Sequence, residues 1–175
     1  MLLSDGTGLS RLAKTLAGIA LLGAVAGCQV RPLYSTPAMA EGKLASIEIS
    51  EAGGNRVEQQ VRNELVFLLG GGAGEPRNAA YRLELHVTSS ALGVLNDVAT
   101  DTMRAGRILV SADYNLARAE TGETVASGKR SASAMVDFPA QEFAKLRAIR
   151  DAENRAAREA AEFVRADVAA ALAGR

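Results

Sequence analysis

Two segments, Ala80–Ser89 and Arg107–Ala117, carry apolar residues at every second position over most of their length, and this pattern constrains the fold more than any other feature of the chain. Successive side chains of a β-strand point to opposite faces of a sheet, so each segment would present one apolar and one polar face. The apolar faces would carry Tyr81, Leu83, Leu85 and Val87 in the first segment and Ile108, Val110, Ala112, Tyr114 and Leu116 in the second. The pattern predicts two strands of a sheet that is covered on one side only.

Two further strands are predicted from weaker patterns. Leu44–Ser50 contains alternating isoleucines, and Thr124–Val136 is rich in serine and alanine with a weak apolar phase. The turn sequence Glu120–Glu123 would join the last two strands as a hairpin. A looser stretch, Ala91–Thr102, would connect the two strongly alternating strands.

Two helices are predicted, one after the first strand and one at the C-terminal end. Asn55 is a good N-cap, and Glu58 follows at capping-box spacing. This first helix would end at the glycine-rich segment Gly70–Gly74, which supplies a C-cap and a loop. The second helix, over Gln141–Ala171, would be about 45 Å long, enough to cross a whole sheet. Its apolar stripe would contain Phe143, Leu146, Ile149, Ala156, Ala160, Phe163 and Leu172, with Ala157, Val164 and Val168 beside it.

This order of elements predicts an α+β fold, a two-layer sandwich in which two helices pack on one face of a small mixed four-stranded sheet. The order is strand, helix, three strands and helix, within a single domain at residues 44–175. Aromatic residues make up only 4% of the chain, and tryptophan is absent. Alanine and valine must therefore form much of the core, so the layers must approach closely.

Residues 1–27 have the layout of a secretory signal peptide rather than of a folded element. Arg11 and Lys14 precede the uncharged apolar run Thr15–Ala26, and small residues follow. This run is shorter than the roughly 20 helical residues that a bilayer core requires. A short membrane anchor or a buried helix is the alternative interpretation of the same residues.

The segment Val25–Cys28 (Val-Ala-Gly-Cys) resembles the lipobox of bacterial lipoproteins, in which an aliphatic and two small residues precede an obligatory cysteine. The resemblance implies cleavage before Cys28, lipidation of its thiol and acylation of the new N-terminus; the alternative is a buried core thiol. Gln29 stands where aspartate retains many lipoproteins at the inner membrane, and therefore points to the outer membrane. Residues 28–43, which contain two prolines, would form an extended tether.

The sequence does not assemble a recognisable catalytic, metal or cofactor site. His86 is the only histidine, and neither a nucleophile elbow nor a second histidine at metal-ligand spacing accompanies it. Cys28 is the only cysteine, which excludes an intramolecular disulfide and a multi-cysteine metal site. Asp97, Asp101 and Asp113 could be paired carboxylates, but scattered carboxylates are usually solvated. We therefore predict a protein that is not an enzyme and that needs no metal or cofactor.

The basic residues suggest an anionic ligand. The chain carries 20 basic and 20 acidic side chains, so it has no overall field that would attract nucleic acid. Arg104 and Arg107 precede one predicted strand, and Lys129 and Arg130 lie in the next, so a hairpin could bring all of them near one end of the sheet. Arginine grips phosphate with two parallel donors and lysine adds a point charge, which would suit a lipid with phosphorylated head groups. Ordinary surface charge is the alternative explanation.

Three features together resemble the lipopolysaccharide-assembly lipoprotein family LptE in its alphaproteobacterial form. They are the lipobox followed by Val30–Tyr34 (Val-Arg-Pro-Leu-Tyr), the element order given above, and the C-terminal segment Asp151–Ala157. The chain departs from the family next to the cysteine, where Gln29-Val30 replaces the frequent Gly-Phe. The resemblance covers nearly the whole chain after Cys28.

The resemblance implies a partner protein rather than a catalyst. Such lipoproteins sit on the periplasmic face of the outer membrane, plug the β-barrel translocon LptD, assist its assembly and are implicated in binding lipopolysaccharide. Partners of this chain would then be LptD, lipopolysaccharide and the membrane, without nucleic acid, and Arg104, Arg107, Lys129 and Arg130 become candidate lipopolysaccharide contacts. Two other functions fit a lipoprotein of this size: an auxiliary lipoprotein of an ABC-type lipid transporter, and a lipid-anchored hydrolase that depends on His86.

Overall fold

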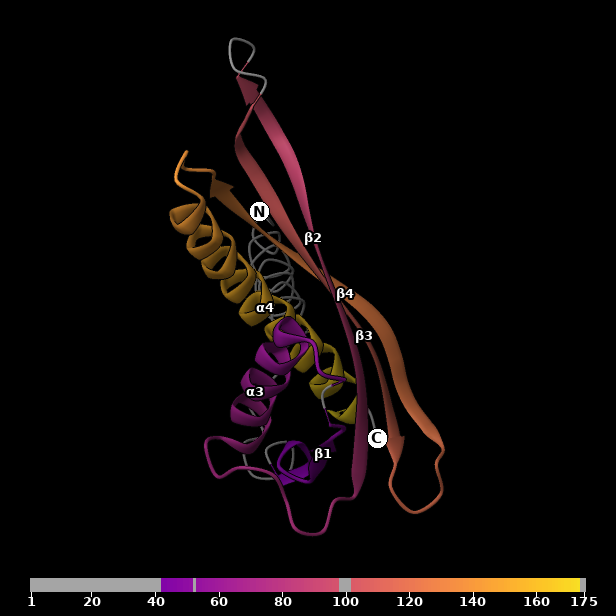
Figure 1. The fold of residues 1–175 in the computed structure, drawn as a ribbon. Helices are drawn as coiled ribbons and strands as arrows, with labels where there is room; N and C mark the ends of the chain where they lie inside the picture. The colour runs from indigo at the N-terminus through magenta and orange to yellow at the C-terminus, as the bar shows by residue number, and fades with distance from the viewer. Residues whose placement is uncertain (1–41, 52, 98–101, 174–175) are drawn as a thin grey trace, which may run out of the picture. The chain divides into compact units, whose positions relative to one another are not determined.

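The computed structural model describes residues 42–51, 53–97 and 102–173. Along the chain lie β1 (Ile47–Ile49), α3 (Arg56–Gly70), β2 (Tyr81–Asp97), β3 (Thr102–Arg118), β4 (Thr124–Asp137) and α4 (Glu142–Ala173) (Figure 1). The strands form a four-stranded sheet in the order β1-β2-β3-β4, with β1 parallel to β2 and the other neighbours antiparallel. The predicted α+β class, mixed sheet and element order are confirmed.

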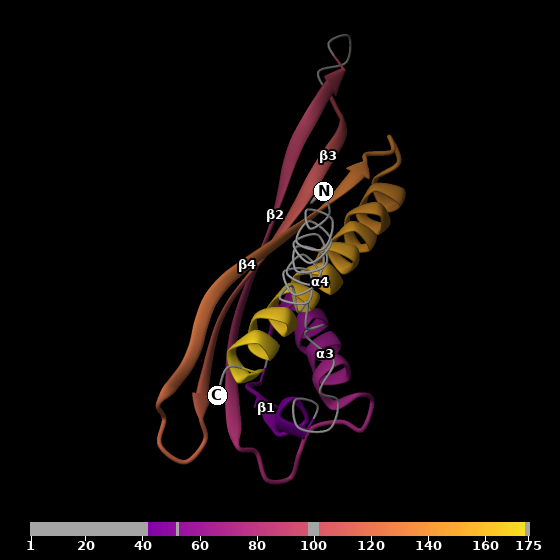
Figure 2. The same cartoon turned by 180° about the vertical axis from the view of Figure 1, so that it is seen from behind.

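Both helices pack on the same face of the sheet, as predicted. α3 contacts β1 and β2, α4 contacts β3 and β4, and the two helices contact each other (Figure 2). In both views the hairpin formed by β2 and β3 extends beyond the N-terminal end of α4. Among the described residues, no helix is both long enough and apolar enough to cross a membrane.

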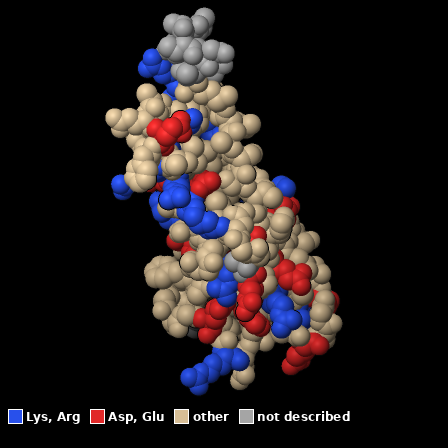
Figure 3. All heavy atoms as spheres, in the orientation of Figure 1, with Lys and Arg blue, Asp and Glu red and all other residues tan. Residues whose placement is uncertain are grey.

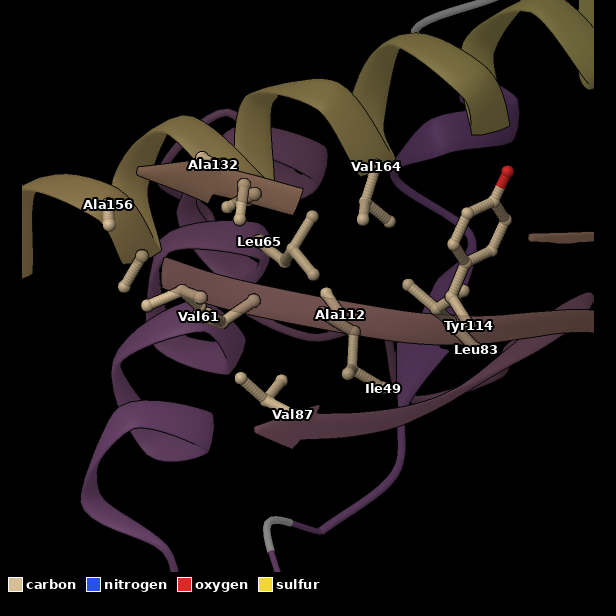
Figure 4. Packing of buried hydrophobic residues seen from close by; sticks show 14 of the residues in the cluster. Ile49, Val61, Leu65, Leu83, Val87, Ala112, Tyr114, Ala132, Ala156 and Val164 are labelled. Carbon is tan, nitrogen blue, oxygen red and sulfur yellow. The ribbon is translucent and has the colours of Figure 1, made fainter. Parts of the chain in front are cut away.

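The core between the layers is built largely from small aliphatic side chains. Figure 4 shows Ala156 and Val164 of α4 facing the sheet, with Leu65 of α3 and Ala112 and Ala132 of the strands close by. The buried residues of α4 are Ala152, Ala156, Ala157, Ala160, Ala161, Val164, Val168, Ala169 and Leu172. Because alanine adds so little bulk, α4 can lie close to β3 and β4, as the composition predicted.

Three large apolar residues that were predicted to be buried on α4 are exposed instead. Phe143 is 76% exposed, Leu146 52% and Phe163 41%. The buried part of the helix begins only at Ala152, so the first two of these residues precede it. Phe163 stands beside a buried stripe that is narrow, since alanines and valines alone form its central part. These exposed apolar groups are available for contacts outside the core.

The N-terminus of α3 is attached to β2 as well as capped. The side-chain oxygen of Asn55 accepts a hydrogen bond from the backbone N–H of Val57 at 3.0 Å, which confirms the predicted N-cap. Asn55 Nδ2 also donates to the carbonyl oxygen of Val87 at 3.2 Å. Glu58, which is buried, accepts from the backbone N–H groups of Gly53 and Val87. The capping residues therefore fix the start of α3 to one edge of the sheet.

Two boundaries differ from the sequence prediction. Residues 42–44 form a helical turn, so Leu44 precedes β1 instead of belonging to it. The stretch Ala91–Thr102 was predicted as a loose connection, but β2 continues to Asp97 and β3 begins at Thr102. The pairing register shifts twice between Gly93 and Asn96, and such bulges break the two-residue alternation by which a strand is recognised. Hydrogen bonds across the hairpin hold these residues in strand conformation regardless of pattern.

Candidate functional site

The sheet face opposite the helices, called the open face here, carries polar and small side chains in rows across three strands. One row consists of His86, Asp113 and Lys129, which are register partners on β2, β3 and β4. Lys129 Nζ donates to a carboxylate oxygen of Asp113 at 3.0 Å. In the neighbouring row the hydroxyl groups of Ser111 and Ser131 are 2.8 Å apart. Lys129, one of the predicted lipopolysaccharide contacts, is thus partly neutralised by a carboxylate of the same face.

Arg130, the next predicted contact, clamps β4 to α4. Its Nε and Nη2 donate to the two carboxylate oxygens of Asp167, both at 2.6 Å. The hydroxyl of Tyr114, which points toward α4 in Figure 4, donates to Asp167 Oδ2 at 2.7 Å. Gly128 makes room for this ring, since a Cβ at that position would lie 2.9 Å from the Tyr114 hydroxyl oxygen.

The electrostatics of this clamp follow from its hydrogen bonds and its burial. The hydrogen bonds from the Arg130 guanidinium, more than that from Tyr114, lower the pKa of Asp167, against the opposing effect of burial. Burial, and secondly the hydrogen bond to Asp167, raises the pKa of Tyr114 to about 12. Asp167 is therefore held ionised and Tyr114 neutral, which is the combination that both hydrogen bonds require.

The interactions of Asp167 with Arg130 and Tyr114 stabilise the fold to an extent that depends on pH in the acid range. Because the pKa of Asp167 in the folded state lies below its ordinary value of 3.8, its contribution is present above about pH 4 and is lost as the pH falls through the folded value. We expect Asp167→Asn to lower the urea midpoint of unfolding at pH 7 and to make it less sensitive to acidification below pH 4 than in the wild type. Equal acid sensitivity of the two proteins would contradict this assignment.

Arg104 and Arg107 lie on opposite faces of the sheet. They are separated by an odd number of positions on β3, and Arg104 lines a cavity on the helix side. Arg107 is on the open face, where its register partners are Leu92 and Met135. The β3–β4 hairpin is confirmed, but it does not gather the basic residues: Arg107 and Ala112, the partner of Arg130, are about 17 Å apart along β3.

The cavity beside Arg104 lies between the β2–β3 hairpin and the start of α4. Its volume is about 730 Å³, within the range of roughly 300–1,000 Å³ that is usual for small-molecule sites. Its lining combines apolar and charged side chains: Ala91, Met103, Arg104, Phe138, Pro139, Ala140, Glu142, Lys145 and Ile149. The Lys145 ammonium is 5.9 Å from the centre of the Phe138 ring and 3.7 Å from Glu142 Oε1. An anionic amphiphile suits such a lining.

Exposed large apolar side chains gather at the same end of the molecule. They are Leu92, Val94, Leu95, Met103, Met135, Phe143 and Leu146, from β2, β3, β4 and α4. On the side seen in Figure 3, most acidic groups lie in the lower half, and uncharged surface predominates toward the hairpin. Grouped apolar exposure of this kind marks contact sites for lipids or proteins. Sequence patterns missed Lys145 and Phe138, because a helical lysine and a residue after a strand carry no signal of their own.

The remaining predicted site residues do not form a second site. Cys28, Gln29 and Asp101 lie outside the described residues, as do the predicted signal peptide and most of the predicted tether. Asp113 is paired with Lys129 rather than with another carboxylate. His86 is exposed on the open face. The cavity is therefore the arrangement best suited to bind a ligand in the part of the chain that the structure describes.

Comparisons with known proteins converge on one group of lipoproteins. The model of the lipopolysaccharide-assembly family LptE matches residues 44–167. A crystal structure of a protein from Caulobacter crescentus, described as a lipoprotein, is 30% identical, with a TM-score of 0.65 over 79% of this chain and 98% of that one. The rare lipoprotein B of Shewanella oneidensis is 13% identical, with a TM-score of 0.56 over 73% of this chain and 96% of its own, and so shows likeness of fold. No curated protein sequence matches the chain.

Proposed function

Because the chain belongs to the lipopolysaccharide-assembly family LptE, we propose that it is a lipoprotein of the outer membrane that partners and plugs the LptD β-barrel. In this role it assists assembly of the barrel and insertion of lipopolysaccharide. The observation that carries the lipopolysaccharide part of the proposal is the cavity between the hairpin and α4, with its mixed apolar and cationic lining.

The chemistry of the cavity fits the lipid end of lipopolysaccharide. That molecule joins phosphorylated sugars to several acyl chains, so its receptor needs cations beside apolar surface. Arg104 and Lys145 supply the cations, and Met103, Phe138 and Ile149 supply apolar lining. The exposed apolar groups of the hairpin extend this surface toward solvent. Arg107 and Lys129 stay candidate contacts on the open face, and Arg130 is committed to Asp167.

The rest of the proposal concerns location and partners. Lipid on Cys28 would hold the protein on the periplasmic face of the outer membrane, and residues 28–43 would set the length of its tether. The protein would act by binding, without catalysis, cofactor or nucleic acid. The auxiliary lipoprotein of an ABC-type lipid transporter is the competing assignment, which a co-purification experiment separates from the first.

The double variant Arg104→Glu/Lys145→Glu is expected to bind immobilised lipopolysaccharide about tenfold to a hundredfold more weakly than the wild type. Loss of a charge-assisted hydrogen bond costs about 1.5–3 kcal/mol, and about 1.4 kcal/mol is a factor of ten in affinity. The comparison variant is Arg107→Glu/Lys129→Glu, which makes the same charge change at the two candidate contacts of the open face and is expected to weaken binding less. Undiminished binding by the cavity variant, with loss in the open-face variant, would move the site to the open face.

The partnership is tested by purifying the tagged lipoprotein from membranes after mild crosslinking. A heat-modifiable β-barrel in the eluate is the expected result, whereas an inner-membrane permease would overturn the proposal in favour of the ABC-type system. Depletion of the protein should also lower folded barrel and surface-exposed lipopolysaccharide together. Normal levels of both after depletion would contradict the proposed function.

A further inference from the structure

The outer edge of β2 is covered only in part. β1 pairs with Tyr81–Leu83, while β2 runs on to Asp97. Beyond β1, side chains take over the role of a neighbouring strand for a short distance. Ser50 Oγ accepts from the backbone N–H of Leu85 at 3.3 Å, and Glu58 and Asn55 bind the N–H and carbonyl groups of Val87.

After Val87, in the described part of the chain, no strand pairs with this edge; the contact there is made by a side chain, since Ser89 Oγ donates to Glu153 Oε1 of α4 at 3.3 Å. In an antiparallel strand, alternate residues direct both backbone groups to the same side. The groups of Leu83, Leu85 and Val87 point away from β3, so those of Ser89 and Ala91 do too. Within the described residues, no hydrogen bond reaches these outward groups from another part of the chain. They present two donors and two acceptors in the geometry of a β-ladder.

The composition of this edge favours strand addition rather than opposing it. Proteins usually protect free edges with charged side chains, prolines or bulges. Residues 88–95 (Thr-Ser-Ser-Ala-Leu-Gly-Val-Leu) contain no charged residue and no proline. The opposite edge, on β4, carries Lys129 and Arg130, and Arg155 Nη2 donates to the Met135 carbonyl oxygen at 2.9 Å. The edge on β4 is therefore protected by charged side chains, whereas the free part of the β2 edge has no charged residue of its own.

The length of the uncovered edge limits what can bind there. At one end Asn55 occupies the carbonyl oxygen of Val87, so a further strand cannot pair there. At the other end the register shift after Gly93 interrupts the regular strand geometry. The open window, residues 88–93, spans about 20 Å, which accepts a strand of roughly six residues. A second copy would have to bring its own β2 of 17 residues into this window, where Asn55 and the bulge obstruct it. A short extended segment of another protein fits.

We propose that the edge of β2 at residues 88–93 accepts a short, uncharged, extended segment of the β-barrel partner as an additional strand. The inference rests on the proposed function for the identity of that partner. Backbone hydrogen bonds to Ser89 and Ala91 hold the segment, and the exposed side chain of Leu92 contacts its apolar side chains. Such strand addition gives affinity through the main chain and specificity through alternate side chains.

The test uses the full lipidated chain in cells, with a photo-crosslinking amino acid at Thr88 or at Ser127 on β4. Thr88 is expected to give an adduct with the barrel in clearly higher yield than Ser127, because only Thr88 stands beside the added strand. Ser90→Lys and Ser90→Glu should each reduce the Thr88 adduct at least about tenfold, because either charge protects an edge. The matched control is Ser133→Lys, since Ser90, Leu109 and Ser133 share one row of the open face and Ser133 lies at the opposite edge.

The outcomes separate this inference from the proposed function. If the wild-type protein does not co-purify with a β-barrel, the proposed function fails. If it does co-purify but Thr88 gives no barrel adduct, or both Ser90 variants retain the wild-type adduct, the strand-addition site is wrong and the function stands. An adduct of twice the protein's own mass would instead identify a second copy at the edge and overturn the proposal.

Discussion

Replacing Cys28 with alanine is expected to move the protein almost entirely from the membrane fraction to the soluble periplasm and to prevent its co-purification with the barrel. The only cysteine of the chain is the proposed site of its lipid. Each buried methylene of an acyl chain contributes about 0.8 kcal/mol to membrane binding. Several acyl chains on one cysteine would therefore hold a domain of this size on a membrane. Fractionation followed by immunoblotting measures the change.

Gln29→Asp provides the control for this experiment. It leaves the lipidated cysteine in place and changes only the residue that is proposed to direct sorting. We expect this variant to stay in the membrane fraction but to shift from the outer to the inner membrane on a density gradient. A Cys28→Ala protein that stays in the membrane, with an unchanged mobility shift on acyl labelling, would disprove lipidation at this residue.

Gly106→Val is expected to destabilise the domain by about 3 kcal/mol and to disrupt the cavity. Gly106 is buried on β3, where a Cβ would lie 2.6 Å from the Phe138 ring and 2.8 Å from the carbonyl oxygen of Leu92. The ring could move, but the backbone oxygen belongs to the β2–β3 ladder and cannot move without breaking it. Overpacking of this kind costs roughly 1–3 kcal/mol and occasionally more. Urea unfolding and lipopolysaccharide binding should both be impaired.

The control for this substitution is Gly70→Ala at the end of α3. A Cβ there has no atom within 4 Å, and the position is helical. Alanine is favoured over glycine in a helix by about 0.5–1 kcal/mol, so this variant should be slightly more stable than the wild type. If Gly106→Val unfolds at the same urea concentration as the wild type, the close approach of Phe138 and Leu92 to this residue is wrong.

The spacing of apolar residues along the sequence was sufficient to predict a strand or helix wherever one face of that element is buried. The alternation around Leu83 and Ile108 predicted strands whose buried and open faces the structure confirms. Asn55 and Glu58 predicted the start of α3, and glycine at position 71, with φ of 58°, provides its C-cap. These signals are local, because a cap or an alternating pattern reports the environment of a few neighbouring residues.

The sequence by itself determined the element order, the composition of the core and the family to which the chain is similar. Tertiary structure decided which side chains meet. Only register and layer packing place Arg104 with Lys145 at a cavity, bind Arg130 to Asp167 and leave Arg107 on the opposite face. Only the short reach of β1 leaves the edge of β2 open beyond Val87. Such juxtapositions join residues distant along the chain, so they depend on how strands and helices pack, which no local pattern encodes.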